Sequence, residues 1–149
     1  MPHRKLWQLT FNPGVQSEPT WSPDGHWICF NAVTSPGTSS VYVVPTSGGD
    51  WTAITDDRFW GDKPRWAPDG RTIYFTLTRA GFVNVWGRRF DPVRGTPLGE
   101  VFPVTKFEAP SRMLLPQIQQ LHLALVHKQL ILPLTDVSSS IWVLDNVNQ

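Results

Sequence analysis

The chain has 149 residues, about the length of one domain, and 40% of them are hydrophobic while only 17% are charged. This composition supplies a packed core and excludes an intrinsically disordered chain, which would be richer in charge. Thirteen lysines and arginines balance 12 aspartates and glutamates, so no nucleic-acid partner is expected, and the absence of a long apolar stretch argues against a membrane partner.

The residue usage favours strands over helices. Eight tryptophans and eight phenylalanines accompany fourteen prolines and eleven glycines. Aromatic residues suit a half-buried sheet, and closely spaced Pro and Gly residues indicate many short antiparallel strands separated by turns. The fold class predicted is therefore all-β.

The first predicted element is a strand over residues 6–10, Leu-Trp-Gln-Leu-Thr. It matches two later strand ends, Ile54-Thr55 and Val104-Thr105, each of which closes a repeat unit. No strands precede it in this sequence. Residues 1–16 are therefore expected to hold a fourth strand without its first three, followed by a linker.

Two segments further along the chain repeat each other with an offset of 45 residues, Glu18 to Phe30 and Lys63 to Phe75. Each predicts a strand ending in Trp, a Pro-Asp-Gly turn and a second strand with Ile and Phe on one face. A period near 45 residues is typical of β-propeller blades with four strands each. The repeated residues interpreted as structural are Trp21, Pro23, Asp24 and Gly25 in the first unit, and Trp66, Pro68, Asp69 and Gly70 in the second.

Third and fourth strands complete both units. The third strands are predicted at Val41–Val44 and Asn84–Trp86, and the fourth at Trp51–Thr55 and Glu100–Thr105. Two whole blades of four antiparallel strands can thus be drawn, over residues 17–61 and 62–106.

Residues 107–149 predict a degenerate blade that lacks a fourth strand. Its three strands are expected at Leu121–Val126, Gln129–Leu132 and Ser140–Leu144, and His127-Lys128 replaces the Pro-Asp-Gly turn. The whole chain therefore carries about three blades' worth of strands in circularly permuted order.

The Trp-Ser-Pro-Asp-Gly motif, the following Ile-x-Phe, the Val-Tyr-Val third strand and the closing Ile-Thr resemble the TolB-like β-propeller repeat. That family includes the periplasmic Tol component, propellers of prolyl-oligopeptidase-like enzymes, and propeller tails behind bacterial kinase or regulatory domains. The resemblance implies a ring of six or seven blades. It implies little about function, because propellers host many unrelated roles.

Three blades cannot close a ring, since closed propellers have typically four to eight. The first hypothesis is a homodimer, a six-bladed ring in which residues 6–10 of each chain complete the third blade of the other by strand exchange. The alternative is a C-terminal propeller segment of a larger bacterial protein, such as a peptidase gating domain or the sensory tail of a kinase or regulator.

No catalytic constellation is found, so the protein is predicted not to be an enzyme. The chain has no Gly-x-Ser-x-Gly elbow, and Ser39, Ser40 and residues 138–140 are interpreted as loop serines. Cys29 lies between Ile28 and Phe30, where a buried thiol is expected.

No metal or other cofactor is expected either. His122 and His127 are five residues apart and would lie on opposite faces of a continuous strand. Asp56, Asp57 and Asp62 could gather around calcium, but they lack a regular calcium-loop spacing, so solvated or loop-bracing carboxylates are favoured.

Four tryptophans recur at repeat positions and are interpreted as blade-to-blade packing: Trp21, Trp66, Trp86 and Trp142. Trp60 differs, because it is expected to lie in an irregular connection beside Arg58. An exposed aromatic next to an arginine would suit contact with a partner peptide. The alternative is that Trp60 anchors its own loop.

A protein or peptide ligand is expected at the mouth of the central channel, where the innermost strands begin. The residues at these positions are Ser17, Glu18, Asp62, Lys63, Gln119 and Gln120. They would give a polar rim of mixed charge.

No signal peptide is recognised, because no apolar run follows the basic pair Arg4-Lys5. The sequence as written therefore predicts a cytoplasmic protein. A periplasmic location stays open if the chain is part of a longer precursor.

Overall fold

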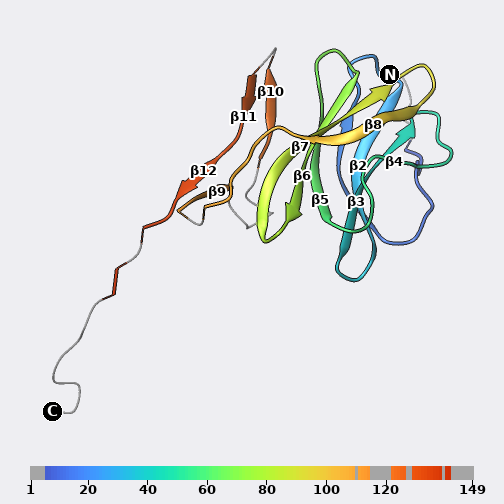
Figure 1. The fold of residues 1–149 in the computed structure, drawn as a ribbon. Helices are drawn as coiled ribbons and strands as arrows, with labels where there is room; N and C mark the ends of the chain where they lie inside the picture. The colour runs from blue at the N-terminus through green and yellow to red at the C-terminus, as the bar shows by residue number, and fades with distance from the viewer. Residues whose placement is uncertain (1–5, 110, 115–121, 127–128, 139, 142–149) are drawn as a thin grey trace.

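The computed structural model describes residues 6–109, 111–114, 122–126, 129–138 and 140–141. Every regular element in these residues is a β-strand, so the all-β prediction is confirmed. The strands form two four-stranded antiparallel sheets and two two-stranded pairs. Figure 1 shows the two larger sheets beside each other, with the two pairs on the far side of the second sheet.

The first sheet, called blade 1, has its strands in sequence order. They are β1 (Val15–Trp21), β2 (Trp27–Ser35), β3 (Thr38–Pro45) and β4 (Thr52–Ala53). The turn between β1 and β2 is the predicted Pro-Asp-Gly. Gly25 has a φ of 74° and donates its N–H to the carbonyl of Ser22 (2.9 Å), while the Asp24 carboxylate accepts the N–H of His26 (3.0 Å).

Blade 2 repeats this arrangement in β5 (Trp60–Trp66), β6 (Thr72–Arg79), β7 (Phe82–Asp91) and β8 (Thr96–Pro103). Its register copies that of blade 1, because Trp66 pairs with Ile73 as Trp21 pairs with Ile28. The offset of 45 residues read from the sequence is thus an offset between equivalent positions in space.

A threonine closes the fourth strand in both blades. The hydroxyls of Thr55 and Thr105 accept the backbone N–H groups of Val41 and Val85, each at 2.9 Å. The equivalent pair Leu9-Thr10 was expected to be a strand, but residues 6–10 form none. The physical reason is that no third strand lies beside them among the described residues, so their backbone has no ladder to join.

The main hydrophobic core lies between the two blades. Cys29, Val41 and Val43 on one face of blade 1 pack against Ile73 and Phe75 on the facing side of blade 2. Alternation along the strands sends the other residues to the opposite faces. The outer face of blade 1 carries a smaller cluster of Phe30, Ala32 and Val44, against which Leu9 packs.

The remaining strands, β9 (Arg112–Leu114), β10 (Ala124–Val126), β11 (Gln129–Ile131) and β12 (Leu134–Asp136), lie against blade 2. Strand β10 pairs with β11, and β9 pairs with β12. The prediction placed strands where β10 and β11 occur, but it did not expect β9 or β12.

The pairing of β9 to β12 resembles the β1–β2 hairpin. In blade 1 the start of β1 pairs with the end of β2, the end of β1 pairs with the start of β2, and the register breaks between Ser17 and Thr20. In the third unit, likewise, the early strand β9 pairs with the late strand β12, and β10 pairs with β11 between them in the sequence. Of the predicted strand at 140–144, residues 142–144 lie outside the described residues.

Candidate functional site

The predicted rim positions occupy irregularities in the first strands of the two blades. The register of β1 shifts between Ser17 and Thr20, and that of β5 shifts between Asp62 and Arg65. Glu18 and Lys63 lie at the equivalent places in these bulges, with φ values of 54° and 52°. Few non-glycine residues adopt this left-handed conformation, and such residues concentrate at functional sites.

The two bulge residues contact each other across the blades. The Lys63 ammonium donates to Glu18 Oε1 at 2.7 Å, and Arg65 Nη2 lies 3.3 Å from Glu18 Oε2. The Lys63 side chain is 5% exposed and that of Glu18 is 30% exposed. Partial burial by itself raises the pKa of Glu18, but hydrogen bonds and charge from Lys63 and Arg65 outweigh it and hold the pKa below its ordinary value.

Arg65 extends this contact to the third unit. Its Nε donates to the backbone carbonyl of Leu123 at 3.0 Å, and its Nη1 donates to the carbonyl of Pro64 at 2.7 Å. One guanidinium therefore links blade 1, blade 2 and the residues before β10.

Asp62 is a buried carboxyl beside the ion pair. It is 4% exposed, and one of its oxygens accepts the backbone N–H of Lys63 at 2.7 Å. Burial raises the pKa of Asp62, and the charge of Glu18 adds to that effect, while Lys63 opposes it. The rim therefore combines one carboxyl that favours its ionised form and one that resists ionisation.

Ser17 lies at the accessible side of the same bulge. It is exposed, and its hydroxyl donates to Asn31 Oδ1 at 3.0 Å. From there Asn31 donates to the Ser39 hydroxyl (3.3 Å), which donates to the carbonyl of Gly61 (2.7 Å). The predicted rim residues Gln119 and Gln120 lie outside the described residues.

The site offers charge and hydrogen bonds without an activated nucleophile. In the part of the chain that the structure describes, no serine or cysteine side chain hydrogen-bonds to a histidine. Burial raises the pKa of the Cys29 thiol to about 12. The same residues contain no group of three His, Cys, Asp or Glu side chains arranged to hold a metal ion.

The repeat tryptophans differ in burial. Trp66 is 7% exposed, whereas Trp21 at the equivalent position is 63% exposed, so the packing expected for Trp21 is not made within the described part of the chain. Trp86 is half-buried, and Trp142 lies outside the described residues.

Arg58 and Trp60, which were predicted to contact a partner, lie in different environments. Trp60 is half-buried and begins strand β5, so it does not lie in an irregular connection. The Arg58 side chain is 75% exposed and forms an ion pair with Asp56, whose pKa is lowered chiefly by that hydrogen bond.

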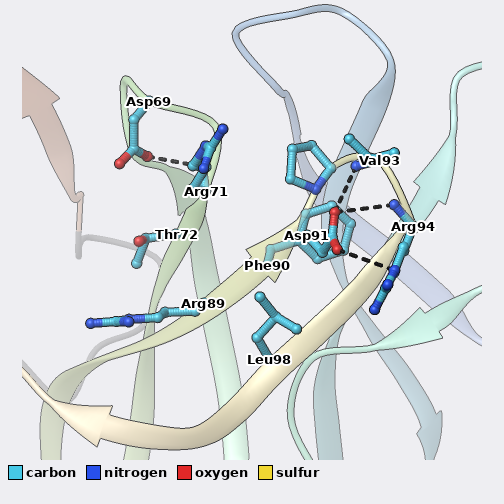
Figure 2. A pocket seen from close by; sticks show the side chains of 10 residues that line it. Asp69, Arg71, Thr72, Arg89, Phe90, Asp91, Val93, Arg94 and Leu98 are labelled. Atoms are coloured by element: carbon cyan, nitrogen blue, oxygen red, sulfur yellow. Dashed lines mark hydrogen bonds and ion pairs between the residues drawn. The ribbon is translucent and has the colours of Figure 1, made fainter.

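A hollow of about 630 Å³ lies at the turns of blade 2, away from the rim residues. Figure 2 shows its lining, which comes from the β5–β6 turn and the start of β6, from β7, and from the β7–β8 turn and β8. Sequence reasoning did not single out this place, because its side chains are far apart in the chain. Its charged lining residues are Asp69, Arg71, Arg89, Asp91 and Arg94.

No family model matches the chain. Curated relatives match parts of it: an uncharacterized peptidase, YuxL, of Bacillus subtilis (34% identity over 42% of this chain), an uncharacterized protein of Agrobacterium fabrum (32% over 48%) and the Tol-Pal system protein TolB of Alcanivorax borkumensis (32% over 53%). The matched regions span only 9%, 24% and 18% of these three relatives.

Two solved structures share the fold. A protein of Agrobacterium tumefaciens assigned as TolB superimposes with a TM-score of 0.57 at 24% identity, covering 86% of this chain and 47% of the other. TolB of Acinetobacter baumannii gives a TM-score of 0.50 at 22% identity, covering 67% of this chain and 23% of the other. No helix among the described residues is long and apolar enough to cross a membrane.

Proposed function

Because the chain is built of TolB-like β-propeller blades, we propose that it is a non-enzymatic scaffold that binds a protein or peptide at its channel rim. In this proposal two copies of the chain close one six-bladed ring. The observation that carries the binding site is the contact between Glu18 and Lys63, at equivalent bulges of neighbouring first strands.

The outer face of blade 1, which has no neighbouring blade among the described residues, supports ring closure. Its Ile28 and Phe30 are equivalent to Ile73 and Phe75 of blade 2, which are buried against blade 1. A repeat protein buries each such face against a neighbouring unit. The exposure of Trp21 marks where the next unit would lie, and a second copy of this chain supplies one.

The fraction of a solved structure that this chain covers also supports an assembly of two copies. The superposition covers 86% of this chain but 47% of the Agrobacterium tumefaciens protein. Two copies of this chain would thus account for about the length of that protein. In the proposed ring Leu9-Thr10 of one chain would pair with a third strand of the other, as Ile54-Thr55 pairs with Val41 in blade 1.

The chemistry of the rim suits recognition rather than reaction. Lys63 is held by Glu18, Asp62 is buried, and Ser17 is exposed beside them. A peptide backbone or polar side chain arriving at the rim would find fixed hydrogen-bonding groups and little conformational entropy to lose.

The test is a selection of phage-displayed random peptides on the purified protein, followed by affinity measurements. Peptides that bind the rim should lose binding to Ser17→Glu and keep it for Thr96→Glu, since both residues are exposed but Thr96 lies on β8. Equal affinity for both variants, or a selection that yields no binder, would overturn the proposal.

A second function is favoured by the lengths of the relatives. Each curated relative is at least four times longer than the region matched, and one of them is named a peptidase. The alternative proposal is therefore a propeller segment of a larger bacterial protein, with a gating or sensory role. Intact-mass analysis of the polypeptide isolated from its own cell tests this alternative: a mass well above 16.9 kDa supports the segment, and 16.9 kDa contradicts it.

The cellular location is part of this proposal. The cytoplasmic location expected from the sequence has no support in the comparisons. One relative is named as a component of the Tol-Pal system, and the Tol component of the family that the sequence resembles is periplasmic, so we propose a periplasmic location. Fractionation of the native cell tests this, since recovery of the protein only with cytoplasmic markers would contradict a periplasmic location.

A further inference from the structure

The hollow at the turns of blade 2 (Figure 2) has an excess of positive charge that its protein surroundings do not use. Arg71 follows the Pro-Asp-Gly turn, Arg89 lies on β7, and Arg94 lies in the β7–β8 turn. Among the described residues, the side chains of Arg71 and Arg89 have no ion pair, and Arg94 has one of 3.8 Å with Asp91.

The two carboxylates beside these arginines are occupied by backbone groups. Asp69 Oδ1 accepts the N–H of Arg71 at 2.8 Å, and Asp91 Oδ1 accepts the N–H groups of Val93 (2.9 Å) and Arg94 (3.2 Å). These bonds shape the turns. Asp91 Oδ2 faces Arg94 at 3.8 Å, and neither carboxylate forms an ion pair with Arg71 or Arg89, so these two guanidinium groups remain available to an external oxyanion.

The turn that carries Arg94 is fixed in place by blade 1. The Trp27 indole donates to the carbonyl of Pro92 at 3.1 Å, and the N–H of Gly95 bonds to the carbonyl of Asp91 at 2.8 Å. Gly95 has a φ of 68° and lies so close to the Trp27 ring that a Cβ would overlap it. A rigid turn presents its side chains to a ligand at a low entropic cost.

Repeat architecture does not require this cluster. His26 stands in blade 1 where Arg71 stands in blade 2, and Pro45, the cross-strand partner of Trp27, occupies the place of Arg89. The corresponding β3–β4 connection contains Ser47-Gly48-Gly49-Asp50 and no arginine. The three arginines are therefore a departure specific to blade 2.

Exposed apolar side chains adjoin the charged ones. Val93 is 92% exposed and Leu98 is 45% exposed, and both line the hollow. Its volume of about 630 Å³ lies in the range of small-ligand sites, about 300 to 1,000 Å³. The surface thus combines unpaired positive charge with apolar contact area.

We propose that this hollow binds an acidic segment of a protein partner, whose carboxylates contact Arg71 and Arg89 and whose neighbouring apolar side chain packs on Val93 and Leu98. The site shares no residue with the rim and does not depend on ring closure. It would give the scaffold a second attachment point for a partner.

The test uses a fluorescein-labelled peptide of alternating Glu and Leu residues, its Gln counterpart, and fluorescence anisotropy at low ionic strength. The Glu peptide should bind, and the Gln peptide should bind at least about tenfold more weakly. The Arg71→Gln/Arg89→Gln variant should also bind the Glu peptide about tenfold more weakly. Equal binding of the two peptides, or no saturable binding, would overturn the proposal.

The matched control is Lys106→Gln/Arg112→Gln, which removes two positive charges from exposed ion pairs elsewhere. It should change the affinity less than about twofold. A loss as large as that of the Arg71→Gln/Arg89→Gln variant would show that binding depends on the net charge of the protein and not on this hollow, and would contradict the proposal. Val93→Ser on the exposed turn should weaken binding without affecting folding. Competition with inorganic phosphate at constant ionic strength completes the test, since full displacement together with an unaffected Val93→Ser would assign the site to free oxyanions and contradict the peptide proposal.

Failure of the proposal for the hollow can be distinguished from failure of the rim proposal. Peptides selected on the rim depend on Ser17, whereas the acidic peptide should bind Ser17→Glu and the parent protein equally.

Discussion

The indole N–H of Trp66 donates a hydrogen bond to the backbone carbonyl of Thr20, 3.2 Å away in the neighbouring blade. The same ring packs edge-on against Phe90, with centroids 5.3 Å apart. Trp21 precedes Trp66 by one repeat and makes no equivalent hydrogen bond among the described residues. Trp66 thus shows how blade 2 packs against blade 1, and the exposed Trp21 shows that blade 1 has no such neighbour among the described residues.

The two tryptophans should therefore respond differently to truncation. Trp66→Ala removes a buried ring and should destabilise the chain by about 3–5 kcal/mol. Trp21→Ala should change the unfolding free energy of the dilute chain by less than about 1 kcal/mol, while weakening self-association. Urea unfolding and sedimentation at several concentrations measure the two effects, and equal destabilisation by both changes would contradict this prediction.

The Glu18–Lys63 ion pair should stabilise the junction between the blades. Glu18→Gln leaves the buried Lys63 ammonium without its partner and should cost about 1–3 kcal/mol. The double change with Lys63→Met should cost less than the sum of the single changes, because no unpaired charge remains. Glu108→Gln is the control, since Lys106 and Glu108 are both exposed; its effect should stay below about 0.5 kcal/mol.

The contribution of Glu18 should depend on pH in one direction. Its pKa in the folded chain is lower than the ordinary 4.5, so the folded state holds its proton less tightly than the unfolded state does. The stabilisation is complete above pH 4.5 and is lost as the pH falls through the folded pKa. The stability difference between the parent and Glu18→Gln should shrink accordingly, and a difference that grows on acidification would disprove this.

Asp62 should show the opposite dependence. Burial raises its pKa above the ordinary 3.8, so the folded chain holds the proton more tightly, and ionisation opposes folding as the pH rises above that value. Asp62→Asn should therefore gain stability relative to the parent between pH 3.8 and neutrality. Urea unfolding at a series of pH values measures the gain, and a constant difference across the series would count against it.

Gly95 should tolerate no side chain. A Cβ there would overlap the Trp27 ring, and its φ of 68° disfavours any non-glycine residue. Gly95→Ala should cost about 3 kcal/mol from overlap and backbone strain. Gly81→Ala, at a φ of 82° with no atom near its Cβ, should cost about 1 kcal/mol and serves as the control in thermal unfolding.

The sequence predicted the two complete blades because their turns and tryptophans repeat in register. It did not predict β9 and β12, since each is only three residues long and neither is followed by the Pro-Asp-Gly turn that marks the repeats. It also placed Leu6–Thr10 in a strand, although a strand forms only beside a partner and none is described there.

The structure shows a contact between two of the predicted rim residues, Glu18 and Lys63, that the sequence analysis did not predict. Their role in a binding rim stays a prediction. The opposite charges of Glu18 and Lys63 at equivalent repeat positions were a signal that neighbouring innermost strands could form an ion pair. Their left-handed backbone conformations could not be predicted, because glutamate and lysine do not favour that conformation. The arginine cluster at the blade 2 turns could not be read from the sequence. Arg71 and Arg89 are brought together only by the pairing of β6 with β7.

Ring closure is the central claim, and the solution mass of the purified chain tests it most directly. Light scattering coupled to size-exclusion chromatography should give a single species at about twice 16.9 kDa, because in the proposed ring each chain covers the outer blade face of the other. A single, well-folded species at 16.9 kDa over the whole concentration range would contradict the account.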